Sequence, residues 1–321
     1  MISVIIPAHN ARDHIGECLR ALSRQEGSEE YETIVVDDGS TDDTAEVARR
    51  FGAFVLEQPH RGPAAARNRG ASLAKGHLLF FTDADCQPSL TWLTRMSEAF
   101  ARQDIVGAKG AYRTRQRSLV ARFVQLEFED KYDFLRKSEY IDFVDTYSAC
   151  YRREVFRANG GFDENIPLPT VEDVDFSFRL SARGYKMVFV PDAIVYHQHP
   201  NSLLHYLRRK FRYGYWRVLI YRRYPGKALA DSRTPHSLRI QVGLAALLLP
   251  AIAILPVTTW LLPLAIIGLF VLSGLPLTIK ALRKDGVVAA VVPLMLLARA
   301  LAIDTGLLAG LTHLLTRKGD A

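Results

Sequence analysis

Residues 62–85, GPAAARNRGASLAKGHLLFFTDAD, predict a helix followed by a short buried strand. The helix is expected at Pro63–Ala74 and the strand at Leu78–Thr82, an apolar run of the length that strands usually have. The preceding residues predict strands at 2–6, 31–36 and 53–56 and helices at 12–25 and 41–51. Strands that alternate with helices in this way are typical of an α/β fold with a mostly parallel sheet and right-handed crossovers.

Acidic residues follow two of these strands. Asp83 and Asp85 come after the fourth strand, and Asp37 and Asp38 come directly after the second. Ligands of open parallel sheets bind beyond the carboxyl ends of the strands, so these side chains mark a candidate ligand site. In an extended segment Asp83 and Asp85 point the same way, and a hard divalent cation that also holds a diphosphate relieves their repulsion. The alternative is a solvated turn in which Asp85 caps the next helix.

Polar residues near these acids have two interpretations each. The residues after Asp38 predict a turn and a helix N-cap at Ser40 or Thr41, which is compatible with Asp38 binding a base or a ribose. Arg67 and Asn68 lie on the helix before the fourth strand. They are either solvated surface residues, or they contact a nucleotide or brace the two acidic loops.

Several motifs in succession resemble family 2 glycosyltransferases of the GT-A fold. SVIIPAHN, VVDDGSTDDT, GPAAARNRG and FFTDAD stand in that family's order and spacing, and RREVFRANGGFDE, VEDVDFSFRLSARGY and PDAIVYHQH extend the match over residues 1–200. The resemblance implies a Rossmann-like catalytic domain that takes a nucleotide-sugar donor, a UDP- or GDP-sugar, and transfers the sugar with inversion. It also implies a Mn²⁺ or Mg²⁺ cofactor.

The resemblance assigns roles to single residues. Asp173 takes the position of the general base, with Glu172 beside it. Asp85 and His197 would hold the metal ion, although His197 is alternatively a structural histidine, and His199 is expected on the same strand face. The residues expected to bind the nucleotide sugar are Pro7, Ala8, His9, Asp38, Arg67 and Asp83.

The acidic pair has a second interpretation. Glu172 and Asp173 stand where a helix is expected to begin, and acids at a helix N-terminus complement the helix dipole, which is compatible with catalysis. Two adjacent acids raise each other's pKa, which helps a base to work near neutral pH. Gly160 and Gly161 are expected to form a sharp turn before this segment.

The C-terminal third is apolar enough for a membrane. Residues 240–279 contain no Asp, Glu, Lys or Arg, and 40 such residues allow two spans of about 20 residues joined near Pro256–Thr259. Residues 287–315 form a third apolar segment that carries Arg299 and Asp304. Charged side chains are costly at the bilayer centre, so this segment is either one long tilted span or a broken, partly re-entrant helix.

The basic residues are concentrated before the first apolar segment. Residues 200–239 hold ten Lys and Arg against one acid, a net +9, which leaves −2 for the rest of a chain whose net charge is +7. By the positive-inside rule this region is cytoplasmic. Leucine and aromatic residues recur in it at helical spacing, which predicts an amphipathic helix on anionic headgroups. The membrane is therefore the expected partner, and nucleic acid is not.

These features predict three regions: a GT-A catalytic domain at 1–200, interfacial helices at 201–239, and two or three transmembrane helices at 240–316. The motif Q-x-x-R-W of processive relatives is absent, since residues 212–216 are RYGYW. A single-addition enzyme is therefore expected, with Arg212, Tyr213 and Trp216 as candidates for contacts with the acceptor or the membrane. Three scattered cysteines argue against a disulfide framework or a zinc site.

The predicted function is a metal-dependent, inverting hexosyltransferase with several spans in the cytoplasmic membrane and a cytosolic catalytic domain. It would move one sugar from a nucleotide sugar to a lipid-linked glycan. The first alternative is direct transfer onto polyprenyl phosphate. A non-catalytic membrane scaffold is the alternative from another class of protein.

Overall fold

A computed structural model of the chain describes residues 1–166, 171–229, 231–232, 234–253 and 259–316. The strands are β1 (Ile2–Ala8), β2 (Tyr31–Asp38), β3 (Phe54–Gln58), β4 (Leu78–Phe81), β5 (Gln87–Pro88), β6 (Ile105–Arg113), β7 (Ala149–Arg152) and β8 (Lys186–Tyr196). The helices are α1 (Arg12–Leu22), α2 (Thr44–Arg50), α3 (Pro63–Leu73), α4 (Trp92–Glu98), α5 (Leu119–Leu135), α6 (Arg153–Ala158), α7 (Glu172–Ala182), α8 (Leu203–Arg223), α9 (Gly226–Leu229), α10 (His236–Ala253), α11 (Leu261–Lys284) and α12 (Gly286–Thr316).

The chain forms two compact units, which are described separately. The first holds residues 1–115 and 135–198, and the second holds 116–134 and 199–321. The sequence predicts a single division after residue 200, whereas the structure groups most of α5 with the C-terminal helices. The predicted functional regions remain predictions.

The first unit is built on one sheet of eight strands in the order β3-β2-β1-β4-β7-β6-β8-β5. The first four strands in this order are parallel, and β6 is parallel to β8. β7 is antiparallel to both of its neighbours, and β5 is antiparallel to β8. The predicted α/β class with a mostly parallel sheet is confirmed, because every strand expected before residue 83 is present and parallel.

Buried strands explain why the sequence pattern was apolar without alternation. Ile2, Val4, Ile5 and Ile6 of β1 have no exposed surface, as expected for a strand covered on both faces. Beside β4, five aromatic rings pack at centroid distances of 5.0 to 6.3 Å and join α6, α7 and the segment between them to the sheet. These rings belong to Phe81, Tyr151, Phe156, Phe162 and Phe176.

Two local predictions at the strand ends are wrong. The helix expected from residue 41 begins at Thr44, and the carboxylate of Asp42 accepts from its N–H at 3.1 Å. Ser40 and Thr41 do not cap it, because both bond to Asn10 in the loop after β1. The chain after β4 is also not extended: the N–H of residue 86 donates to the carbonyl of residue 83 at 3.0 Å and closes a turn.

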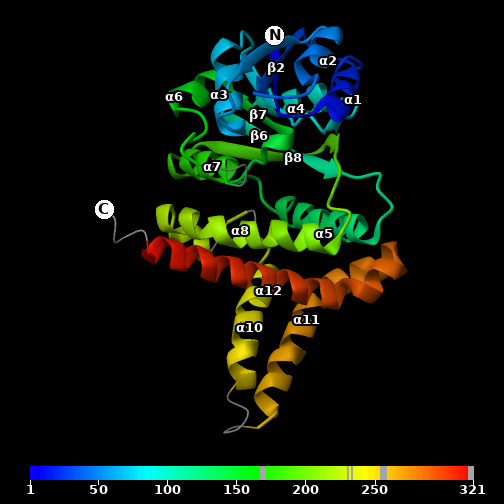
Figure 1. Ribbon diagram of the computed structural model, residues 1–321, viewed down its shortest axis with the longest axis vertical. Coiled ribbons are helices and arrows are strands. Elements are labelled where there is room, and N and C mark those ends of the chain that lie inside the picture. Colours follow the sequence, from blue (N-terminus) through cyan, green and yellow to red (C-terminus); the bar gives the residue numbers. More distant parts are fainter. Residues whose placement is uncertain (167–170, 230, 233, 254–258, 317–321) are drawn as a thin grey trace. The chain divides into compact units, whose positions relative to one another are not determined.

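The second unit is a helical assembly with its own apolar core. α8 and α12 lie side by side, while α10 and α11 form a pair that runs away from them (Figure 1). The shared core takes side chains from α5, α8, α10, α11 and α12, including Phe123, Tyr206, Ala245, Phe270 and Leu296. Each of α10, α11 and α12 is long and apolar enough to cross a membrane. The predicted connection at Pro256–Thr259 falls largely within 254–258, outside the described residues.

Candidate active site

The candidate site lies where β1, β2 and β4 end, because parallel strands direct their carboxyl ends to one edge of the sheet. Pro7 and Ala8 are the last residues of β1, and only Ala8 is fully buried. The loop after β1 is fixed to the loop after β2 through Asn10, whose Oδ1 accepts from the N–H of Thr41 at 2.8 Å. The two loops are therefore held together at this edge of the sheet.

Asp38 organises the segment that leads into α3. Its buried carboxylate accepts from the side-chain amide of Gln58 at 2.7 Å and from the backbone N–H groups of Arg61 and Gly62 at 2.9 and 2.8 Å. All these partners follow or end β3. The Asp38 carboxylate, which is expected to contact the base of the nucleotide, thus has protein partners on both oxygens.

Two imidazole rings lie at this edge of the sheet. His9 and His60 each place Nδ1 within 3.0 Å of the Asp38 carbonyl, and their ring centroids are 4.3 Å apart. Both side chains are exposed. Sequence reasoning missed His60, although its position just after the predicted third strand was a signal.

We expect Asp38→Asn to destabilise the protein by about 1–3 kcal/mol. The asparagine N–H₂ would face a backbone N–H that the carboxylate accepts from in the wild type. That buried donor would then have no acceptor, and an unsatisfied buried donor costs free energy of this size. Urea unfolding measures the change, and amide exchange at Gly62 localises it. Asp37→Asn is the matched control, since within the described part of the chain the Asp37 carboxylate accepts a single hydrogen bond, from the N–H of Ser40, and an amide oxygen can keep it. Equal destabilisation by both variants would contradict the role of the Asp38 carboxylate in holding the segment that leads into α3.

Arg67 joins Asp83, after β4, to Glu172 at the start of α7. It is buried on α3, and its Nη2 lies 2.7 Å from Oδ1 of Asp83 while Nη1 lies 2.9 Å from Oε1 of Glu172. The solvated-surface interpretation of Arg67 is therefore wrong. The segment that Arg67 joins to Asp83 is the start of α7, however, and not the acidic loop after β2 that the bracing interpretation named. Asp83 keeps about a third of its side chain exposed, so it remains accessible to a ligand.

The acids at the start of α7 differ in environment. Glu172 is buried against Arg67, and burial together with the neighbouring Asp173 raises the pKa of Glu172 above its ordinary value. Asp173 is half-buried, and its Oδ1 accepts from the N–H of Val174 at 2.8 Å. The two acids therefore divide: Glu172 faces the protein interior, and Asp173 is the more accessible carboxylate.

A glycine turn and Asn68 hold the segment before α7. Gly160 and Gly161 have φ angles of +74° and +62°, which confirms the predicted sharp turn. The Asn68 side chain accepts from the N–H of Phe162 at 2.9 Å and donates to its carbonyl at 2.8 Å. A Cβ on Gly161 would lie 2.5 Å from Oδ1 of Asn68, so only glycine fits beside this anchor.

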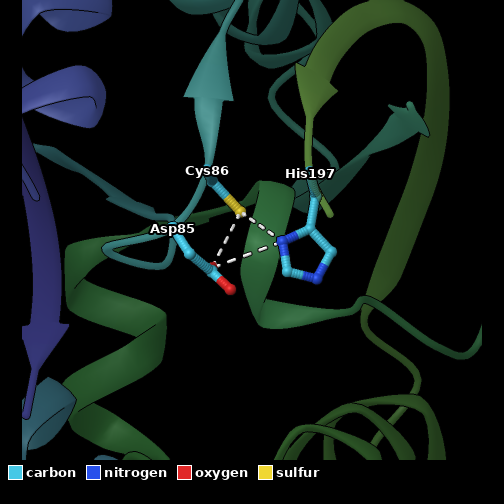
Figure 2. Close-up of side chains that lie close together, drawn as sticks. All are labelled: Asp85, Cys86 and His197. Atoms are coloured by element: carbon cyan, nitrogen blue, oxygen red, sulfur yellow. Dashed lines mark hydrogen bonds and ion pairs between the residues drawn. The ribbon is translucent and has the colours of Figure 1, made fainter. Parts of the chain in front are cut away.

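Asp85, Cys86 and His197 converge between the turn after β4 and the end of β8, as Figure 2 shows. Oδ1 of Asp85 lies 3.3 Å from Nδ1 of His197, and Sγ of Cys86 lies 3.8 Å from the same nitrogen. Burial opposes ionisation of Asp85, but His197 outweighs it and lowers the pKa of the carboxyl. Asp83 does not belong to this group, because the turn directs it to Arg67 instead.

The donor set fits a divalent cation. A carboxylate and an imidazole suit Mn²⁺, and the side chain of Asp85 is 42% exposed, which leaves room for diphosphate oxygens. Cys86 was missed from the sequence, although it directly follows Asp85. Burial and the charges of Asp83 and Asp85 raise the pKa of its thiol well above the ordinary value, so the protein alone keeps it neutral.

Aromatic stacking fixes the ring of His197. Tyr112 of β6 stacks on it at a centroid distance of 5.0 Å, and Tyr147 in turn stacks on Tyr112 at 3.1 Å. The hydroxyl of Tyr147 lies 2.7 Å from Nζ of the buried Lys109. The prediction for His199 is wrong: β8 ends at Tyr196, and His199 is buried in the helical unit, stacked on Phe128.

The predicted acceptor residues all lie on α8 in the helical unit. Arg212 is exposed. Tyr213 is half-buried under the guanidinium of Arg217, which lies 4.6 Å from the ring centroid. Trp216 is half-buried and packs edge-on against Tyr215 at 5.2 Å.

Comparisons with known proteins define the class of this one. The family model for glycosyl transferase family 2 matches residues 3–160. Glycosyltransferase AglE of Haloferax volcanii is 30% identical over 233 residues, which cover 68% of this chain and 74% of AglE. The chain belongs to this glycosyltransferase family. It is also 30% identical over 221 residues to the uncharacterized glycosyltransferase EpsJ of Bacillus subtilis, covering 63% of this chain and 62% of EpsJ.

Other matches agree at greater distance. Pre-mycofactocin glycosyltransferase of Mycobacterium tuberculosis is 28% identical over 66% of this chain, but the match spans only 46% of that protein. Among solved structures, mannosyltransferase PcManGT of Pyrobaculum calidifontis, in complex with GDP-Man and Mn²⁺, aligns with a TM-score of 0.62. It is 20% identical, and the alignment covers 97% of this chain and 86% of PcManGT. The GT-A fold expected from the motifs is therefore confirmed.

Proposed function

We propose that this protein is a metal-dependent, inverting glycosyltransferase that moves one hexose from a nucleotide sugar to a lipid-linked glycan. The observation that carries the proposal is the buried bridge of Arg67 between Asp83 and Glu172. It ties a donor-side carboxylate to the segment that presents Asp173. The membership in family 2 supports the sugar transfer itself.

In the proposed reaction Asp173 acts as the general base. The acceptor hydroxyl gives its proton to this carboxylate as its oxygen bonds to the anomeric carbon. The bond from that carbon to the diphosphate breaks, and its electron pair stays on the diphosphate. A divalent cation held by Asp85 and His197 would neutralise the charge on the leaving group. Glu172 is a positioning residue in this scheme, because it contacts Arg67.

The helical unit supports a membrane-bound acceptor. Three apolar helices and the basic α8 belong to one unit, as expected where a water-soluble donor meets a substrate in lipid. We place the protein in the cytoplasmic membrane, with its catalytic unit in the cytosol where nucleotide sugars are available. Exposed arginines on α8 favour direct transfer onto polyprenyl phosphate as the second candidate. All the acids that the resemblance assigns to the site are present in this chain, which argues against a non-catalytic scaffold.

A donor screen tests the proposal. Full-length protein in detergent is given Mn²⁺, a panel of GDP- and UDP-sugars and a membrane lipid extract, and release of nucleoside diphosphate is measured. GDP-mannose is the first donor to try, since PcManGT was solved with GDP-Man. Turnover with one donor that depends on a lipid fraction is the expected result. Absence of both binding and turnover with every donor would overturn the proposal.

Metal dependence gives a separate prediction. We expect Asp85→Ala and His197→Ala each to raise the Mn²⁺ concentration for half-maximal activity by about 10- to 100-fold or more, because losing even a supporting contact at a metal site has effects of that size. Cys86→Ser is the matched control: a neutral, buried thiol replaced by a hydroxyl should change the requirement little. If the Mn²⁺ requirement changed only in Cys86→Ser, Asp85 and His197 would not be the metal ligands.

A further inference from the structure

α8 and α12 pack with their backbones in contact, so the two helices lie at the same level relative to any membrane. A Cβ added to Gly306 of α12 would lie 2.1 Å from the carbonyl oxygen of Phe211, and one on Gly310 would lie 2.4 Å from that of Tyr215. Gly214 of α8 approaches the backbone of α12 in the same way, at 2.3 Å. Backbone contact over this length means that whatever surrounds one helix also surrounds the other.

The charges of α8 exclude the hydrocarbon core of a bilayer. Its exposed arginines occur from its second turn to its end, and an exposed arginine at the bilayer centre is costly. These residues are Arg208, Arg209, Arg212, Arg222 and Arg223. α8 therefore lies in the headgroup layer or in water, and α12 lies beside it.

Ion pairs along α12 and at its start agree with this placement. Arg299, in the middle of α12, is buried and pairs with Glu127 of α5. At the junction of α11 and α12, Asp285 accepts from Arg122 at 2.7 Å, and Lys280 pairs with Asp133 at 2.7 Å. Because α5 is a charged helix, both the start and the middle of α12 lie at a polar level.

The length and the exposed face of α12 also fit a helix that lies along a membrane. Its 31 residues correspond to about 46 Å, well above the roughly 30 Å of a hydrocarbon core. Exposed apolar side chains recur at multiples of seven residues and so follow one face, at Val287, Leu294, Leu308 and Leu315. Such a stripe suits the boundary between headgroups and acyl chains.

A groove opens between the two helices. It has a volume of about 360 Å³, and its lining comes from α8 and from Ala302 and Thr305 of α12. The α8 residues are Leu204, Leu207, Arg208, Phe211 and Arg212. The two arginines are one helical turn apart, and within the described part of the chain neither has a carboxylate partner. The groove thus combines an apolar floor with two uncompensated positive charges.

We propose that α8 and α12 lie together in the headgroup layer, with α12 along the membrane and not across it, and that their groove binds the phosphate of a membrane lipid. Arg208 and Arg212 would hold the phosphate, and Leu204, Leu207 and Phe211 the start of the hydrocarbon chain. The proposal rests on the proposed membrane attachment but not on sugar transfer. α10 and α11 are then the membrane-spanning pair among the described helices.

Label depth tests the placement of α12. The three native cysteines are buried, so single-cysteine variants can be spin-labelled in the full chain in liposomes. Leu308→Cys and Leu315→Cys should report the same shallow depth, and Leu272→Cys, in the middle of α11, a deep one. If α12 crossed the membrane, the first two labels would differ in depth by about 10 Å, since seven residues rise by that distance. That result would overturn the placement.

Lipid binding tests the groove. Native mass spectrometry of the full chain in detergent compares phosphatidic acid with diacylglycerol of the same chains and with inorganic phosphate. We expect phosphatidic acid to bind, diacylglycerol not to bind, and equimolar inorganic phosphate not to displace it. The double variant Arg208→Gln/Arg212→Gln should weaken binding at least tenfold.

The control is Arg209→Gln/Arg222→Gln, which removes the same charge from exposed positions of α8 outside the groove. It should bind phosphatidic acid as the wild type does, and both double variants should keep the wild-type thermal transition. Equal weakening in both would mean general charge attraction and would overturn the site, as would displacement by free phosphate. Intact lipid binding without sugar transfer would instead reject the proposed function alone.

Discussion

Asp173→Asn is expected to lower kcat by about three orders of magnitude, within the range of 10²–10⁴ that a general base contributes. The amide cannot take the proton of the acceptor hydroxyl. It keeps an oxygen that can accept from the N–H of Val174, the bond that Asp173 makes at the start of α7. The fold and donor affinity should therefore change little, and the loss should appear in kcat rather than in the donor Kd.

Single-turnover rates and calorimetric donor binding separate these effects. Glu172→Gln is the matched control, because it makes the same change one residue earlier, at a side chain that contacts Arg67 and lies in the interior. We expect it to affect stability and KM more than the chemical step. An Asp173→Asn variant with wild-type kcat would remove Asp173 from the reaction. A larger kcat loss in Glu172→Gln would transfer the role of base to Glu172.

The order of strands and helices was predictable because burial leaves a strong pattern in the sequence. β1 and β4 are apolar runs of strand length that are buried along nearly their whole length, and β2 is buried from Ile34 onward. The same pattern placed Asp38 and Asp83 at strand ends, where the structure has them. Helix starts were less predictable, because Ser40 and Thr41 had a competing partner in Asn10, 30 residues earlier in the chain.

The side-chain partners across the sheet could not be predicted from the sequence. Nothing near Asp38 indicated that its carboxylate is occupied by Gln58 and two backbone N–H groups, since those contacts depend on the path of the chain after β3. Likewise the turn after β4 separates Asp83 from Asp85 and brings Cys86 toward His197. Strand periodicity cannot foresee a turn that begins immediately after the last paired residue.

The third apolar segment shows the same limit. Hydropathy and length made residues 287–315 a candidate span, and the pattern could not say what Arg299 contacts. Its partner Glu127 lies 172 positions away on a charged helix. In the proposed placement, this pairing and the contact of α12 with α8 determine the environment of the helix, which composition alone left open.

Arg67→Met is expected to destabilise the protein by about 3–5 kcal/mol, the cost of removing one partner from a buried ion pair. Asp83 and Glu172 both lose their counter-charge, and methionine roughly fills the volume of the arginine stem. Denaturant unfolding should show the loss. The stability of Arg67→Lys should lie between those of the wild type and Arg67→Met, because a lysine keeps the charge but lacks the forked guanidinium that reaches both carboxylates.

The loss in Arg67→Met should also depend on pH. Burial and Asp173 already raise the pKa of Glu172, and without Arg67 it rises further. The folded variant then holds a proton that the unfolded chain releases, so its stability is greater at acidic pH and falls as the pH rises through the raised pKa. Adding Glu172→Gln should restore stability and flatten this dependence, since no charge remains to be buried at that position. A double variant as unstable and as pH-dependent as Arg67→Met would show that the Arg67–Glu172 pair does not hold the two segments together.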